Sequence, residues 1–328
     1  MRRREFITVV GGAALWPLRV GAQEPERVRR VGVLMNLAPD DPEGQVRLKV
    51  FLQALEKQGW AEGRNLRVDT CWGAGKAERY RGCAAELIGL APDVVLAGSG
   101  SAMPALMDAT RSLPIVFVQT VDPVGSGYVA SLAKPDGNAT GFTQFEYKMG
   151  GKWLELLKQI APHVKRVAIL RDLATNEGPA QFAAVQLAAP GLGMESVPIG
   201  VRDAGEIERG ITAFAAKADG GLVITASAYT AVNRDVIIAL AARHRLPAVY
   251  PFRYHVVSGG LVSYGPEPRE SYQRAAGYVN RILKGERPGD LPVQAATSFE
   301  LVVNLKTAKA LGLVIPESLV ARADEVID

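Results

Sequence analysis

VRRVGVLMN at residues 28–36 recurs as VKRVAILRD at residues 164–172, and this repeated stretch decides the fold. Two further pairs follow in the same order: PDVVLAGS (92–99) with GGLVITAS (220–227), and LPIVFVQT (113–120) with LPAVYPFR (246–253). The offsets are 136, 128 and 133 residues. Nearly constant offsets across three apolar runs indicate a duplicated unit. A chain of 328 residues has room for two cores of ordinary size.

Each copy alternates short apolar runs with longer amphipathic stretches, which is typical of a parallel sheet covered by helices. The runs are rich in Val, Ile and Leu without strict alternation, as expected for strands buried on both faces. We therefore predict an α/β fold of two similar lobes, each a parallel sheet flanked by helices, joined by a hinge. The first lobe covers residues 23–143 and the second covers residues 144–264. A cleft between two lobes is a common place for a small ligand.

Residues 265–328 follow both copies and must return across the hinge. After the Gly265-Pro266 break, an amphipathic helix at 270–284 is predicted to pack on the first lobe. A strand at 299–305 and helices at 306–311 and 317–325 are predicted to close the chain, and the sequence leaves open which lobe holds them. PDGNATG at 135–141 is interpreted as a turn cluster before the first crossover.

The first 22 residues are predicted to be a twin-arginine-type signal peptide. Arg3-Arg4-Glu5-Phe6-Ile7 fits the twin-arginine pattern, and an apolar stretch and a small-residue end follow it. The apolar stretch is shorter than the ~20 residues that span a bilayer. We therefore expect cleavage near Ala22 and a mature chain that is periplasmic.

The charge of the chain lies mostly in this leader. The whole sequence carries a net charge of +4, and four arginines against one glutamate give the first 22 residues +3, which leaves +1 for the rest. A nearly neutral mature chain gives no support for binding nucleic acid.

Cysteine and histidine are scarce. Cys71 and Cys83, the two cysteines of the chain, are compatible with a disulfide or with separate buried thiols. The three histidines, His163, His244 and His255, do not stand at ligand spacing with a cysteine. No metal and no cofactor is predicted.

Polar and small residues follow the strands of the first lobe, where ligands bind in open parallel sheets. The candidates are Asn36 after the first strand and Ser99, Gly100, Ser101 and Ala102 after the third. We expect the serine-rich loop to hold a carboxylate, although a serine there can simply cap the following helix. Asp122, next to Pro123, is a candidate partner for a ligand ammonium, and its alternative role is a turn.

The second lobe offers matching positions. Asn176 and Ser227 are candidate polar contacts, and turn chemistry is their alternative role. Tyr250, Tyr254 and Tyr264 could stack on an apolar or aromatic ligand, or belong to the core with an exposed hydroxyl.

Motifs of common enzyme classes are missing. No G-x-G-x-x-G follows the first strand and no G-x-S-x-G elbow occurs. GAGK at 73–76 resembles the end of a phosphate-binding loop, but Ala77 replaces the required Ser or Thr. An enzyme is therefore not predicted.

Several long segments carry a family likeness. GLVSYGPEP near Gly260, RILKGERPGDLPVQ from Arg281, FELVVNLKTAKALGL from Phe299 and the stretch at 113–141 resemble the tryptophan/tyrosine-type ABC transporter substrate-binding proteins. The resemblance implies two lobes like those of type I periplasmic binding proteins, and delivery of a ligand to a membrane permease driven by an ATPase. It also matches residues 99–102 and 122–124 to segments that line the cleft. Val121 stands where the family often has Gly.

We therefore predict the periplasmic substrate-binding component of an ABC importer, which captures a small organic solute in the cleft. A carboxylate-bearing molecule, such as an amino acid or an aromatic compound, is the expected ligand. The permease and its ATPase are the expected partners, and the protein is expected to be a monomer. The alternatives are an exported ligand sensor for a signalling partner and, less favoured, an exported α/β enzyme.

Overall fold

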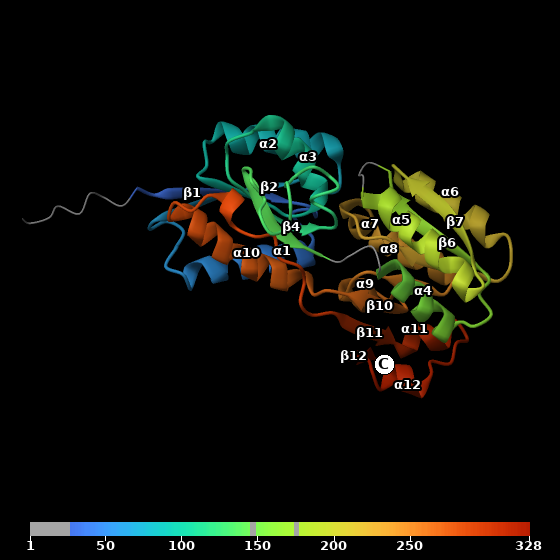
Figure 1. The fold of residues 1–328 in the computed structure, drawn as a ribbon. Coiled ribbons are helices and arrows are strands. Elements are labelled where there is room, and N and C mark those ends of the chain that lie inside the picture. The colour runs from blue at the N-terminus through green and yellow to red at the C-terminus, as the bar shows by residue number, and fades with distance from the viewer. Residues whose placement is uncertain (1–26, 145–148, 174–176) are drawn as a thin grey trace, which may run out of the picture.

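The computed structural model describes residues 27–144, 149–173 and 177–328. The predicted signal peptide and Asn176 lie outside the described residues. The strands form two separate sheets, one of five strands and one of seven, and Figure 1 shows them in two lobes side by side. The predicted fold class, two α/β lobes with mostly parallel sheets between helices, is confirmed.

The first sheet is parallel throughout, in the order β2-β1-β3-β4-β5. Its central strands are buried on both faces, which explains their unbroken apolar runs. The strands are β1 (Arg29–Met35), β2 (Leu66–Trp72), β3 (Val94–Ala97), β4 (Ile115–Thr120) and β5 (Ala139–Thr143).

Strand β5 corrects the interpretation of residues 135–141 as a turn cluster. The turn ends at Asn138, and the small and polar residues after it pair with β4. Their small and polar side chains misled the prediction, although all five residues of β5 are buried. Thr140 Oγ1 donates to the main-chain oxygen of Leu291 at 2.6 Å.

Helices cover both faces of the first sheet. Phe51 and Tyr272 belong to the core on one face, and Leu87 and Leu106 belong to the core on the other. The first face carries α1 (Pro42–Glu56) and α10 (Pro268–Leu283), and the second carries α2 (Ala77–Gly89), the 3-10 turn η1 (Gly100–Ala102) and α3 (Met103–Ala109). Figure 1 shows α10, in orange, among the blue and cyan elements of the first lobe.

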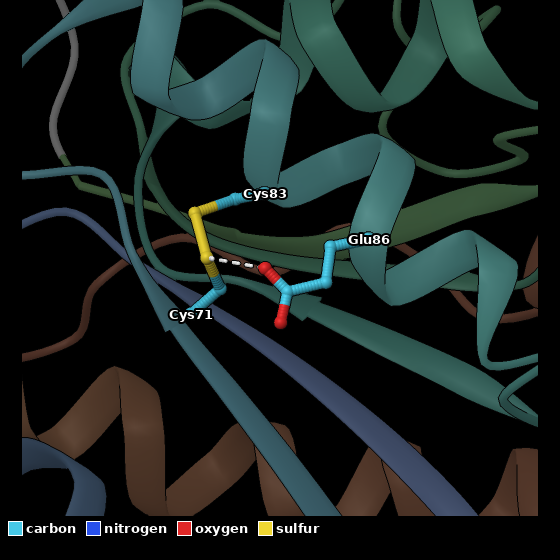
Figure 2. Close-up of a disulfide and its surroundings, with 3 residues drawn as sticks. All are labelled: Cys71, Cys83 and Glu86. Carbon is cyan, nitrogen blue, oxygen red and sulfur yellow. Dashed lines mark hydrogen bonds between the residues drawn. A yellow bond between two sulfur atoms is a disulfide. The ribbon is translucent and has the colours of Figure 1, made fainter.

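Cys71 and Cys83 form a disulfide that ties β2 to α2 (Figure 2). The Glu86 carboxylate lies 3.7 Å from Cys71 Sγ, and because a disulfide sulfur carries no proton this is a contact and not a hydrogen bond. The sequence left open whether the two cysteines form a disulfide or are separate buried thiols, and the structure shows the disulfide. The cross-link closes a short loop within the first lobe.

Removing the cross-link should destabilise the protein. The two cysteines are 12 residues apart, and closing a loop of that size stabilises a fold by about 3 kcal/mol through the entropy of the unfolded chain. We expect the double variant Cys71→Ala/Cys83→Ala to lose about that much free energy of unfolding in urea denaturation. The control is the unmodified protein in a reducing agent, which should lose about the same free energy of unfolding. A loss of less than about 1 kcal/mol in both would contradict the prediction.

The second sheet has the order β12-β11-β10-β9-β8-β6-β7, in which β10 and β11 are antiparallel and the other pairs are parallel. Its strands are β6 (Arg166–Asp172), β7 (Glu195–Val201), β8 (Gly220–Ile224), β9 (Ala248–Tyr250), β10 (Val262–Gly265), β11 (Glu300–Asn304) and β12 (Glu325–Ile327).

Helices also cover both faces of this sheet. One core contains Trp153, Val185 and Leu319, and the other contains Ile211 and Ile237. The helices of the lobe are α4 (Met149–Ile160), α5 (Glu177–Ala188), η2 (Ala189–Leu192), α6 (Ala204–Ala215), α7 (Ala228–Val232), α8 (Arg234–Arg243), α9 (Arg253–Val257), α11 (Leu305–Ala310) and α12 (Glu317–Val320).

The end of the chain adds two strands to the second sheet. The strand expected at 299–305 is β11, but the helix expected at 317–325 is shorter, because residues 325–327 extend beside β11 as β12. The Asp324 side chain accepts from Leu301 N at 2.7 Å and so fixes this pairing. The chain therefore passes between the lobes after β5, after β10, and again after η3 (Pro288–Asp290).

In the part of the chain that the structure describes, we find no helix with the length and apolar character needed to cross a membrane. The same residues contain no group of three or more His, Cys, Asp or Glu side chains placed to hold a metal ion.

Candidate ligand-binding cleft

A cavity lies between the two lobes at the carboxyl ends of their strands. The cavity is narrow, and residues from both lobes line it. The first lobe contributes residues at or just after the ends of β1, β3, β4 and β5, and the second contributes residues that follow β8 and β9. The lining residues are Asn36, Ser99, Ser101, Gln119, Gln144, Ala226, Ser227, Ala228, Ala231, Phe252 and Tyr254.

The first-lobe wall of the cavity carries polar atoms without partners. Asn36 Oδ1, Ser99 Oγ, Gln119 Nε2 and Gln144 Oε1 are all buried and make no hydrogen bond within the described residues. The Tyr80 hydroxyl is a neighbour of Ser99 but donates to the main-chain oxygen of Asn36 at 3.4 Å. Buried polar groups in proteins are nearly always hydrogen-bonded. Four such atoms around one cavity therefore point to a polar molecule that binds there.

The second-lobe wall is mostly apolar and aromatic. The rings of Phe252 and Tyr254 stack with centroids 5.4 Å apart, and Ala226, Ala228 and Ala231 lie beside them. Burial raises the pKa of the Tyr254 hydroxyl to about 12, so this ring is uncharged at neutral pH. The cavity thus places hydrogen-bonding groups on one side and aromatic surface on the other.

A chain of buried charges supports the first-lobe wall. Arg47, on α1 and almost fully buried, donates to Glu43 Oε1 at 3.0 Å and to Gln119 Oε1 at 3.1 Å. Glu43 also accepts from Arg269, at the start of α10, at 2.9 Å. Burial alone would raise the pKa of the Glu43 carboxyl, but the two guanidinium groups lower it overall. The carboxylate is therefore charged at neutral pH.

The two lobes touch directly across the cleft. Arg234 on α8 donates to Asp41 Oδ2 at 2.6 Å, and both side chains are largely buried. The Arg47 guanidinium lies 5.2 Å from the centre of the Tyr254 ring. A side chain at Gly75 would come within 3.3 Å of the backbone of α7. These contacts hold the lobes together around the cavity.

A second, narrow cavity lies behind the cleft. Gln119, Gln144 and Phe252 line both cavities, so they form the wall between them. The second cavity also contacts the start of α10, including Glu270 and Arg274.

Residues 40–327 match the family described as "ABC transporter substrate binding protein". The chain belongs to this family.

Relatives of known structure and description support the assignment. A "Tyrosine-binding protein" of Clostridioides difficile (strain R20291) is 26% identical over 265 residues, which are 81% of this chain and 76% of that protein. A crystal structure of a conserved domain protein from Vibrio cholerae O1 biovar El Tor is 28% identical, with a TM-score of 0.83 over 92% of this chain and 100% of that one. The structure of an ABC domain from Streptococcus pneumoniae in complex with L-Trp is 24% identical, with a TM-score of 0.83 over 91% and 99%.

These comparisons confirm the resemblance that the sequence indicated. The matched family consists of substrate-binding proteins of ABC transporters, and the fold is that of type I periplasmic binding proteins. The expected non-enzymatic role agrees with such a family.

Five of the candidate residues of this substrate-binding protein come together at the cavity: Asn36, Ser99, Ser101, Ser227 and Tyr254. Ser99 does not cap the helix after it, so its hydroxyl stays available. Ser227 also has a local structural role, the turn chemistry that was its alternative interpretation, because its side chain forms a capping box with Thr230 at the start of α7.

The structure places the other predicted residues elsewhere. Asp122 Oδ1 accepts from Gly125 N at 2.7 Å, which is the turn role of this residue next to Pro123. Tyr250 lies in the core against His255, and Tyr264 packs on Phe299. Gly100 and Ala102 are buried in η1 and do not line the cavity. Turn and core packing therefore account for these side chains.

Sequence reasoning missed both glutamines, Phe252 and Arg47. Gln119 lies near the end of β4, three residues before the candidate Asp122, and Gln144 directly follows the unexpected strand β5. Arg47 gave no signal, because a single arginine within an amphipathic helix is usually solvent-exposed. Its burial depends on residues far away in sequence, among them Gln119 on β4, Tyr254 of the second lobe and Tyr272 on α10.

Proposed function

We propose that this protein is the exported solute receptor of an ABC importer, and that it captures a zwitterionic amino acid with an aromatic side chain. The observation that carries the proposal is the cavity itself. It is lined by four first-lobe residues whose buried polar atoms have no partner within the described residues, and by the stacked Phe252 and Tyr254 of the second lobe. The polar atoms suit an amino acid's charged groups, and the rings suit an aromatic side chain. Relatives described as binding tyrosine and L-Trp support this ligand class.

The mechanism follows from the two half-sites. Ligand bound to one lobe completes its contacts only when the other lobe closes, so its binding energy favours the closed state about a hinge. The closed receptor would then deliver the ligand to the permease. The disulfide supports an oxidising compartment such as the periplasm. Cleavage of the leader near Ala22 and a monomeric state remain part of the proposal.

A ligand screen tests the proposal. The chain from residue 23 should be screened against the twenty amino acids by thermal shift, and positives titrated by calorimetry. We expect L-tyrosine or L-tryptophan to raise the melting temperature and to bind with micromolar or tighter affinity. At a concentration 100 times Kd, a ligand stabilises the folded state by about 2.7 kcal/mol, which is readily measured. The proposal fails if neither amino acid binds.

The ion pair across the cleft should favour closure. Arg234→Ala removes its pairing with Asp41 but leaves Asp41 to cap α1, where its Oδ1 accepts from Glu43 N at 2.9 Å. For a charge-assisted bond that is mostly shielded from water, we expect a loss of about 1–2 kcal/mol, or about 5- to 30-fold in affinity for the ligand. Calorimetry measures the affinity, and small-angle scattering measures the compactness of the ligand-bound protein.

The matched control is Arg243→Ala. Arg243 lies 3.7 Å from Glu208 within the second lobe, and both side chains are well exposed. Its loss should leave affinity unchanged. Equal affinities of Arg234→Ala and the unmodified protein would show that the pair does not contribute to closure.

A further inference from the structure

Two side-chain amides stand next to each other in the wall of the cleft. Gln119 lies near the end of β4 and Gln144 directly follows β5, and they are 4% and 8% exposed. The two residues are linked, because Gln144 Nε2 donates to the main-chain oxygen of Gln119 at 2.7 Å. Gln119 also has a φ of +54°, a backbone conformation that non-glycine residues seldom adopt.

The protein fixes each amide in one orientation. Arg47 can only donate hydrogen bonds, so the atom of Gln119 that faces it must be the oxygen. A main-chain oxygen can only accept, so the atom of Gln144 that faces it must be the nitrogen. Gln119 is therefore left with a free N–H group and Gln144 with a free carbonyl oxygen. Both free atoms are buried and have no partner within the described residues.

The lining of the cavity is electrically neutral as far as it is described. None of the eleven lining residues is an Asp, Glu, Lys or Arg. A ligand with a net charge would be buried there without a counter-charge, which is costly. A zwitterion can instead be held by oriented amide dipoles, with one donor for its carboxylate and one acceptor for its ammonium group.

We propose that Gln119 and Gln144 form a donor–acceptor pair that determines specificity: Gln119 Nε2 binds the ligand's carboxylate and Gln144 Oε1 binds its ammonium group. Arg47 is the positioning residue that presents the Gln119 donor. The pair selects zwitterionic amino acids over the corresponding amines and acids. This inference rests on the proposed function and names the groups that the site recognises.

The test uses ligands that lack one group each. L-Tyrosine and L-tryptophan are compared with their amines, tyramine and tryptamine, and with their deaminated acids, 3-(4-hydroxyphenyl)propionate and 3-indolepropionate. Calorimetry gives the affinity of each for the unmodified protein and for two variants. We expect the unmodified protein to bind the amino acids at least about 100-fold more tightly than either analogue, because each analogue leaves a buried amide group unpaired.

Gln119→Glu replaces the donor with an acceptor of the same shape, and Arg47 can pair with the new carboxylate. The preference for amino acid over amine should fall at least 10-fold, while the preference over the acid persists. Gln144→Leu removes the acceptor, so the preference for amino acid over deaminated acid should fall at least 10-fold. Gln273→Glu, on the exposed face of α10, is the matched control and should change neither ratio. Melting temperatures show whether each variant folds. If only one of Gln119→Glu and Gln144→Leu folds, that variant alone is enough to test the proposal.

The outcomes separate the two proposals. If the unmodified protein binds no amino acid, amine or acid of the set, the proposed function fails and this inference fails with it. If it binds L-tyrosine or L-tryptophan but every folded variant keeps both ratios within threefold, the inference is wrong while the proposed function stands.

Discussion

Glu43→Gln should destabilise the protein by about 3 kcal/mol, because it leaves the buried Arg47 guanidinium without its counter-charge. Arg47 is 1% exposed and Glu43 is 8% exposed, so solvent cannot compensate. The substitution keeps the size and shape of the side chain, which isolates the effect of charge. Urea denaturation followed by tryptophan fluorescence measures the loss.

The stability of the protein should also depend on pH in a way that reports on the Glu43–Arg47 pair. The pKa of Glu43 is lowered below its ordinary value of 4.5 in the folded state. The charged Glu43 carboxylate therefore stabilises the fold fully above the pKa that Glu43 has in the unfolded chain. This stabilisation is lost as the pH falls through the pKa that Glu43 has in the folded protein. We expect the difference between Glu43→Gln and the unmodified protein to be constant from pH 7 to about pH 5.5 and to shrink at lower pH.

Two further variants make this prediction specific. Glu155→Gln removes an exposed partner of Lys152 and should cost at most about 0.5 kcal/mol. Adding Arg47→Met to Glu43→Gln removes the unpaired charge and should recover part of the stability. If Glu43→Gln costs no more than Glu155→Gln, the buried pair does not contribute to folding.

Gly265→Ala should have an effect of similar size for a steric reason. A Cβ at this position, the last residue of β10, would lie 1.9 Å from the main-chain oxygen of Pro251. Backbone atoms must therefore move, and we expect a loss of about 3 kcal/mol. Pro251 directly precedes Phe252, which lines the cleft, so affinity for the ligand should fall as well. Urea denaturation and calorimetry measure the two effects.

Gly277→Ala is the matched control for this substitution. Gly277 lies within α10 and a Cβ there would meet no atom within 4 Å. Alanine favours helix more than glycine does, so we expect a gain of about 0.5–1 kcal/mol. A Gly265→Ala protein with unchanged stability and affinity would mean that the backbone around Pro251 adjusts freely.

The repeated apolar runs predicted most of the fold because they depend on local sequence alone. Buried parallel strands need continuous Val, Ile and Leu, and β1, β2, β3 and β4 of the first lobe appear where these runs stand. Strand β5 escaped prediction because its residues are mostly small or polar, and β12 because it has only three residues. Short helices such as α7 and α9 were missed because five residues give no clear periodicity.

The candidate site could be predicted only in part. Asn36 and Ser99 were identified because the carboxyl ends of parallel strands are the usual binding edge, a rule that needs only strand positions. Asp122 and Tyr250 met the same rule, but one folds back on its own turn and the other faces the core. Which side chain at a strand end faces the cleft depends on backbone direction, and spacing does not reveal it.

The sequence by itself determined the duplication, the two α/β lobes, the family and the strand ends where a ligand could bind. Tertiary structure alone decided that Cys71 and Cys83 are joined, that the C-terminal strands complete the second sheet, and that Arg47 is buried. It also decided how Gln119 and Gln144 present one donor and one acceptor. Apolar periodicity is a local property of the chain, whereas the partner of a polar atom is set by residues far away in sequence, which only folding brings together.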